Sequence, residues 1–177
     1  QALVDQVNPH YLFNNLSVLK SLIMYDKDKA VQFVQNFTDI YRYVLQVKNR
    51  ILVPFSEELT FVKSYIALHK ERLGDGFSAK FDVQEGALSK SIVPIGLQIL
   101  VENALKHNIA TKSEPLTIEI IADAERVTVK NNLNRKEAVF STRKGLRNII
   151  DRYKMLSEQA VRVQQTETEF IVSLPLI

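Results

Sequence analysis

A single histidine near the start of the chain, His10, lies within the apolar, helix-like segment QVNPHYLFNNL (residues 6–16). Helical steps from this residue reach only polar side chains, which form a narrow seam on an apolar helix: Gln6, His10, Asn14, Ser17 and Ser21. Such a seam can hold one ring nitrogen and leave the other free as a nucleophile. A structural histidine held by one hydrogen bond fits the same pattern. A metal site does not, because no His, Asp or Glu follows at the third or fourth position.

The residue before this histidine is Pro9, which lacks the N–H that a helix interior requires. We therefore expect the helix to bend or loosen at this point. A bend would open the surface around the ring to a bulky partner.

Positive charge is concentrated in one segment, although the net charge of +3 is too small to indicate nucleic-acid binding by itself. Residues 135–154 carry seven Lys or Arg side chains against only Glu137 and Asp151. This excess fits a solvated surface, and it also fits a loop and helix that contact phosphate groups. No basic patch interleaved with aromatic residues occurs elsewhere, so we expect no direct contact with nucleic acid.

The sequence predicts three helices before about residue 73, and these helices would position the histidine. The first has two apolar stripes, one of them Leu12, Leu16, Leu19 and Ile23, so we expect more than one neighbour to bury it. After a break near residue 26, the second has one apolar side: Val31, Val34, Phe37, Ile40, Tyr41, Val44 and Leu45. The third is predicted to begin with Ser56 as its N-cap and to end at GDG, residues 74–76; His69 should lie on its solvated face.

The second half of the chain alternates strand and helix patterns. Strands are predicted at 77–83, 116–122 and 126–133, with a final hairpin at 161–176. Helices are predicted at 92–109, with Pro94 near the start, and at 144–158. The fold class is therefore α+β, with a helical hairpin followed by a sandwich of helices on one face of a mostly antiparallel sheet. We divide the chain into domains at 1–55 and 56–177.

The composition excludes several kinds of site and segment from this chain. The chain has 177 residues and no cysteine, which excludes disulfides and thiolate metal sites. No apolar run approaches the roughly 18 residues that a membrane span needs. The sequence opens with Gln1 inside a helical pattern, so we expect a fragment that an upstream sensor or membrane segment could precede.

The segment around His10 resembles the phosphoacceptor motif of LytS/YehU-type bacterial sensor histidine kinases. The resemblance continues in order through YRYVL (41–45), EEL…YIALHKERLGD (57–75), VPIGLQILVENALKHN (93–108) and KGLRNIIDRY (144–153), so it covers nearly the whole chain. It implies a helical hairpin that dimerises into a four-helix bundle. It also implies a GHKL-type (Bergerat) ATP-binding domain in the second half, and that His10 accepts the γ-phosphate of ATP.

The resemblance assigns roles to individual residues of the nucleotide half. LVENALKHN matches the family's N-box, so Asn103 is expected to help hold Mg²⁺, for which an amide oxygen is a suitable hard ligand. Its neighbour Glu102 would orient a water molecule or polarise the acceptor. Further residues are expected to contact ATP: Lys106, His107, Asn131, Arg143, Lys144, Gly145, Leu146 and Asn148.

Two boxes depart from the family pattern. Asn131 stands where the family has an adenine-reading aspartate, and Leu133 replaces a glycine, so we expect weaker discrimination of adenine. Arg143 replaces the first glycine of G-x-G-L-x-N, which gives up close backbone approach to phosphate and supplies a cation instead. The ATP lid, roughly residues 133–144, is therefore expected to be short and atypical.

The resemblance implies the catalytic core of a two-component sensor histidine kinase, with ATP and Mg²⁺ as substrate and cofactor. The phosphoryl group would pass from His10 to an aspartate of a response regulator, itself DNA-binding, and the chain would be the cytoplasmic part of an inner-membrane-anchored bacterial protein. The altered boxes keep two alternatives open. One is a weak or inactive dimerisation and docking module, and the other is a GHKL ATPase without a phosphoacceptor.

Overall fold

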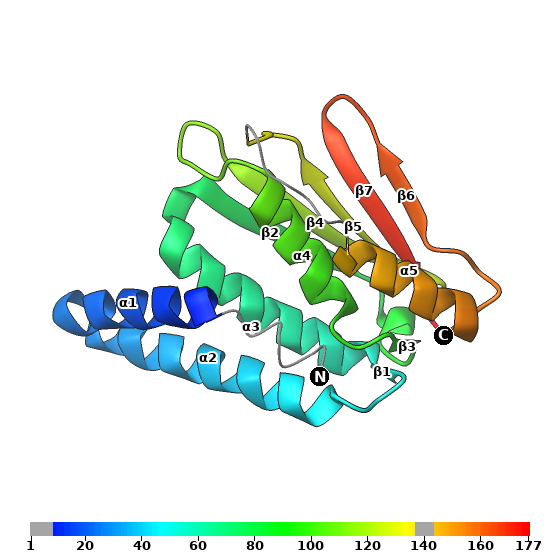
Figure 1. The fold of residues 1–177 in the computed structure, drawn as a ribbon, viewed down its shortest axis with the longest axis horizontal. Coiled ribbons are helices and arrows are strands. Elements are labelled where there is room, and N and C mark those ends of the chain that lie inside the picture. The colour runs from blue at the N-terminus through cyan, green and yellow to red at the C-terminus, as the bar shows by residue number, and fades with distance from the viewer. Residues whose placement is uncertain (1–8, 137–143) are drawn as a thin grey trace.

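The computed structural model describes residues 9–136 and 144–177, and of residues 9–14 the backbone alone. Helices α1 (Pro9–Tyr25) and α2 (Lys27–Val47) form an antiparallel hairpin, and α3 (Phe55–Leu73) lies against α2 (Figure 1). The remaining elements are β1 (Val53–Pro54), β2 (Phe77–Val83), β3 (Ser91–Ile92), α4 (Gly96–His107), β4 (Leu116–Ala122), β5 (Arg126–Asn132), α5 (Lys144–Leu156), β6 (Arg162–Gln165) and β7 (Glu169–Pro175), with 3₁₀ turns at Gly74–Gly76 and Glu85–Ala87.

The main sheet has the strand order β2-β4-β5-β7-β6. Only β2 and β4 run parallel, and every other neighbouring pair is antiparallel, which confirms the predicted mostly antiparallel sheet. The strands predicted at 77–83 and 116–122 and the final hairpin form as expected. A second, two-stranded sheet of β1 and β3 was not predicted, since two residues are too few to show a period.

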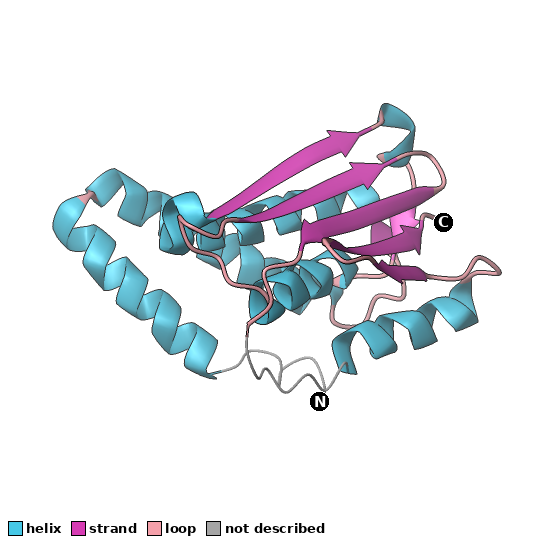
Figure 2. Ribbon diagram, turned by 90° about the horizontal axis from the view of Figure 1, so that it is seen from above, coloured by secondary structure: helices cyan, strands magenta, loops and turns pink. Residues whose placement is uncertain are grey.

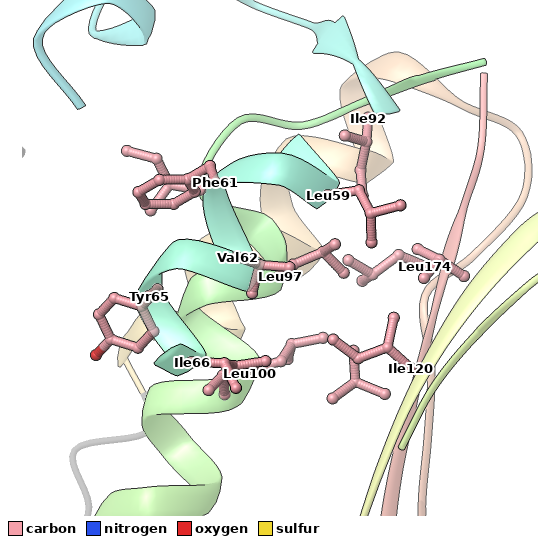
Figure 3. Packing of buried hydrophobic residues seen from close by; sticks show 14 of the residues in the cluster. Leu59, Phe61, Val62, Tyr65, Ile66, Ile92, Leu97, Leu100, Ile120 and Leu174 are labelled. Atoms are coloured by element: carbon pink, nitrogen blue, oxygen red, sulfur yellow. The ribbon is translucent and has the colours of Figure 1, made fainter. Parts of the chain in front are cut away.

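Helices cover one face of the main sheet (Figure 2), as the α+β prediction requires. Burial alternates along β4, where Leu116, Ile118 and Ile120 are fully buried while Thr117 and Glu119 between them are not. The covered face meets apolar side chains of α3 and α4, including Val62 and Leu97 (Figure 3). This core holds the helices that carry the candidate site against the sheet. Because α3 contacts both α2 and α4, the domain division at residues 55 and 56 stays a prediction.

The start of α3 differs from the prediction. The helix begins at Phe55 after Pro54, and Ser56 is not its N-cap. The N–H of Phe55 donates to the carbonyl of Lys90 across 2.8 Å, so the backbone of the β3 region satisfies a group that a side-chain cap would otherwise serve. In contrast, α2 has an ordinary cap, because the side chain of Asp26 accepts from the N–H of Lys29.

The faces that α1 and α2 bury also differ from the prediction. On α2 the buried side chains are Ala30, Phe33, Ile40 and Val47. Three members of the predicted stripe are exposed: Val31, Val34 and Leu45. On α1, Leu16 and Ile23 of the first stripe are 47% and 53% exposed, whereas Leu19 packs against the core. Both helices have apolar residues on two sides, and periodicity does not say which side is covered.

His69 was predicted on a solvated face and is instead buried against Tyr65, with ring centroids 4.6 Å apart. Its Nδ1 accepts from the guanidinium of Arg72 at 3.1 Å. Burial and the charge of Arg72 lower the pKa of His69 to about 3, so the ring is neutral in the folded protein.

No helix within residues 9–136 and 144–177 has both the length and the apolarity for crossing a membrane.

Candidate functional site

A cavity of about 600 Å³ lies at the C-terminal half of α4, between this helix, β5, the start of α5 and the final hairpin. Its polar lining comes mainly from α4, β5 and the segment that follows β5, whereas β6, β7 and α5 contribute mostly apolar side chains. The lining residues are Asn103, Ala104, His107, Asn108, Asn131, Leu133, Arg135, Lys136, Leu146, Val163, Gln165 and Phe170.

Four residues that the sequence assigned to nucleotide binding meet at this cavity. Asn103 and His107 lie one turn apart on α4, Asn131 is near the end of β5, and Leu146 is in the first turn of α5. These residues span more than 40 positions of sequence, so the fold rather than the local chain brings them together.

Other predicted residues do not line the cavity. Glu102 is exposed overall and accepts from the side chain of Gln98 at 2.8 Å, while desolvation raises the pKa of its carboxyl. Lys106 is exposed on α4, and Lys144 and Asn148 are exposed on α5. Arg143 and most of the predicted lid lie outside the described residues.

Gly145 was predicted to let its backbone approach phosphate, and the structure shows a packing contact at this position. A Cβ there would lie 2.9 Å from the Cγ2 atom of Ile99 on α4. The glycine therefore lets α5 approach α4 closely, and this approach places Leu146 at the cavity.

The C-terminus of α4 is tied to the segment after β5, which forms one wall of the cavity. The side chain of Asn108, only 2% exposed, donates to the carbonyl of Ala104 and accepts from the N–H of Asn134. The ammonium group of Lys136 donates to the carbonyl of Leu105 at 2.9 Å. Partial burial, and to a lesser degree the charge of Arg72, lower the pKa of Lys136.

The amide of Asn131 is oriented by its neighbour. Asn131 is buried, and its Nδ2 donates to the backbone carbonyl of Asn132 at 2.7 Å. The amide nitrogen can only donate, so the carbonyl oxygen is the atom of this side chain that can accept from a group in the cavity.

The residues that the sequence did not predict for the cavity are of three kinds. Ala104, Asn108 and Leu133 lie one or two positions from predicted residues in the sequence. Arg135 and Lys136 belong to the basic segment at residues 135–154. Their charge indicated possible contact with phosphate, but the sequence did not show that they lie beside Asn103. Val163, Gln165 and Phe170 come from the final hairpin, and only the pairing of β7 with β5 brings them to the cavity. The sequence predicted that hairpin without predicting its neighbour.

His10 lies in the first turn of α1, and the described part of the structure does not include its side chain. The predicted bend at Pro9 falls where the described helix begins, so it stays a prediction. Farther along the seam, Ser17 and Ser21 are exposed on α1. Within the described residues no group of three or more His, Asp or Glu side chains could hold a metal ion.

The cavity combines two kinds of surface. Leu133, Leu146, Val163 and Phe170 offer apolar contact, while Arg135 and Lys136 bring positive charge and Asn103, His107 and Asn131 bring polar groups. A volume of about 600 Å³ falls within the range of small-molecule sites. This set of groups suits a ligand with a flat apolar part, an amino group and an anionic part.

Comparison with known proteins finds similarity to bacterial sensor proteins and to a family model. Residues 1–77 match the family model described as Histidine kinase. The sensor protein LytS of Staphylococcus saprophyticus is 34% identical over 126 residues, which cover 71% of this chain and 21% of that protein. The sensor histidine kinase YpdA of Escherichia coli is 29% identical over 191 residues, covering 99% of this chain and 34% of that protein. The chain thus spans a fifth to a third of the length of these relatives.

A solved structure of a bacterial phosphotransferase has a similar fold. It covers 97% of this chain and 93% of its own, with a TM-score of 0.54 and 8% sequence identity. At that identity the likeness concerns the fold alone.

Proposed function

Because this chain belongs to the LytS-type sensor histidine kinase family, we propose that it is the catalytic core of such a kinase, with ATP bound in the cavity beside Asn103 and phosphate transferred to His10. The observation that carries the proposal is the convergence of four predicted nucleotide residues on one cavity, in a chain whose first helix includes most of the segment that resembles the family's phosphoacceptor motif.

The chemistry of the cavity supports a nucleotide as ligand. The apolar side chains would contact the base, and the oxygen of Asn131 would accept from an exocyclic amino group such as that of adenine. Arg135 and Lys136 would meet the phosphates. Asn131 has no charge, so the expectation of weaker adenine discrimination stays a prediction.

Asn103 is the residue that we propose as the protein ligand of Mg²⁺. Its side chain lines the cavity, and an amide oxygen suits this hard cation, which takes its other ligands from phosphate and water. When bound, Mg²⁺ would neutralise charge on the phosphates. Glu102, next to Asn103, would act through a water molecule, since its carboxylate does not line the cavity.

The proposed reaction at His10 is an in-line displacement. A lone pair of the neutral imidazole forms an N–P bond with the γ-phosphorus while the bond from phosphorus to the bridging oxygen breaks and ADP leaves. The ring proton passes to solvent. Transfer to a response regulator then breaks the N–P bond and forms an O–P bond to an aspartate carboxylate.

We also propose that the hairpin of α1 and α2 forms a homodimer. Exposed apolar residues on α2 include Val31, Val34 and Leu45, and on α1 Leu16 and Ile23. The positions on α2 repeat with helical spacing, as in helices that pack side by side. Light scattering should give twice the chain mass, and Val34→Lys with Leu45→Lys should give the monomer mass. A monomeric wild-type chain would contradict this part of the proposal.

The other partners that we propose rest on family membership alone. A response regulator, of a DNA-binding kind, would receive the phosphate, and the chain would lie on the cytoplasmic side of a membrane-anchored sensor. No separate nucleic-acid contact is proposed.

The nucleotide site is tested by calorimetry with a non-hydrolysable ATP analogue, with and without Mg²⁺. The wild-type chain should bind one analogue per chain, more tightly with Mg²⁺. Asn103→Ala should lose at least about tenfold of the affinity measured with Mg²⁺ and little of the affinity measured without it. Asn49→Ala, the same change at an exposed position outside the cavity, serves as the control. Absence of binding by the wild type would favour the docking module, and steady phosphate release from ATP that His10→Gln leaves unchanged would favour the ATPase.

A further inference from the structure

A buried carboxylate joins three helices at a distance from the cavity. Glu58, near the start of α3, is 0% exposed. One of its oxygens, Oε2, accepts from the hydroxyl of Tyr43 at 2.6 Å and from the N–H of Ile95 at 3.0 Å, while Oε1 accepts from the N–H of Leu97 at 3.1 Å. A buried carboxylate needs such partners, and here they come from α2 and from the start of α4.

The start of α4 depends on this carboxylate. The first backbone N–H groups of a helix lack partners within the helix, and the residue before α4 is Ile95, whose side chain cannot serve as a cap. Ile95 also has φ 64° and ψ 8°, a left-handed conformation that is costly for a β-branched residue. Glu58 supplies the cap from a different helix and holds Ile95 in this conformation through its N–H.

Tyr43 connects this cap to the hairpin. Its ring stacks on that of Phe61 with centroids 4.3 Å apart, and its hydroxyl reaches Glu58 from α2. The helix that Glu58 caps carries Asn103 and His107 into the cavity. Asn103 lies eight residues after Ile95, about 12 Å along the helix axis. A continuous set of contacts therefore runs from α2 through Glu58 to the helix that lines the cavity.

We propose that Glu58 is a positioning residue for the nucleotide cavity and that the Tyr43 hydroxyl links helix α2 to it, so that nucleotide affinity depends on a contact made by the hairpin. The inference rests on the proposed nucleotide function. The cap sets where α4 begins and hence how its later side chains stand in the cavity. By reciprocity, bound nucleotide strengthens the contact between Tyr43 and Glu58.

The primary test is Tyr43→Phe, which removes one hydroxyl and keeps the ring that stacks on Phe61. Affinity for the non-hydrolysable ATP analogue with Mg²⁺ should fall about fivefold or more, measured well below the melting temperature. Tyr41→Phe, on the same helix, is the matched control and should leave this affinity unchanged. The hydroxyl of Tyr41 has no hydrogen-bond partner among the described residues.

A second variant separates positioning from simple stabilisation. Glu58→Gln should weaken the affinity further, and adding Tyr43→Phe to it should cause no additional loss, because the hydroxyl acts through the carboxylate. If Tyr43→Phe lowers the melting temperature but leaves the affinity of the folded protein unchanged, the contact is only structural and the inference is wrong.

Amide hydrogen exchange keeps this inference separate from the proposed function. In Tyr43→Phe the N–H groups of Ile95 and Leu97 should exchange faster than in the wild type, with or without nucleotide. A wild type that binds no nucleotide would overturn the proposed function and with it the role in affinity. Unchanged exchange at Ile95 and Leu97 would overturn the link from α2 to α4, whatever the nucleotide result.

Discussion

Acidification below about pH 6.5 is expected to destabilise the folded chain through His69. The ring is 6% exposed, and its Nδ1 accepts from Arg72, which can only donate. The folded protein therefore holds the neutral ring with a pKa of about 3, against the ordinary value of 6.5. Between pH 6.5 and pH 3, therefore, the ring is protonated in the unfolded chain but stays neutral in the folded protein.

The direction of this pH dependence of the free energy of unfolding follows from proton linkage. The contribution of His69 to the free energy of unfolding is present in full above pH 6.5 and is lost as the pH falls toward 3. The loss amounts to about 1.4 kcal/mol per pH unit, with a limit of about 5 kcal/mol. Glu58 acts in the opposite sense, because burial raises its pKa to about 7 from 4.5. Its contribution is present in full below pH 4.5 and is lost as the pH rises to about 7.

Urea unfolding of the wild type and of His69→Gln isolates this effect. Both chains carry Glu58, so its contribution cancels in the difference between their free energies of unfolding. That difference should be constant above about pH 6.5 and should fall by about 1.4 kcal/mol for each pH unit below it. A difference that stays constant down to about pH 5 would show that His69 titrates alike in the folded and unfolded chains.

The elements of this fold were predictable where local pattern decides structure. Alternation along β4 and helical spacing along α4 identified both elements, because each element buries one side. The error at Ser56 has a tertiary cause, since the carbonyl that serves the start of α3 comes from Lys90, far along the chain. The error at His69 has the same origin. Lys70, Glu71 and Arg72 follow it in sequence, and only the packing of α3 buries the ring.

The candidate site was predictable in part for similar reasons. Asn103 and Asn131 were found from motifs, and their meeting at one cavity required the sheet order. Phe170 could not be found, because nothing local shows that β7 pairs with β5. The role of Glu58 could not be found from the sequence, since its partners on α2 and at the start of α4 are 15 to 39 positions away.

Replacing His10 by glutamine should abolish phosphorylation of the chain. Glutamine keeps a polar side chain in the seam but has no nucleophilic nitrogen, since the lone pair of its amide is delocalised. The change lies on α1, none of whose described side chains lines the cavity, so affinity for the ATP analogue should be retained. The matched control is His69→Gln, which removes a buried histidine and should leave phosphorylation intact above pH 6.5.

The measurement that bears most directly on the kinase proposal is incubation of the chain with γ-labelled ATP and Mg²⁺. We predict protein-bound label that acid releases and alkali does not, as expected for an N–P bond, with none in His10→Gln. Label that persists in His10→Gln, or a wild type that binds ATP without acquiring label, would contradict the proposal that His10 is the phosphate acceptor.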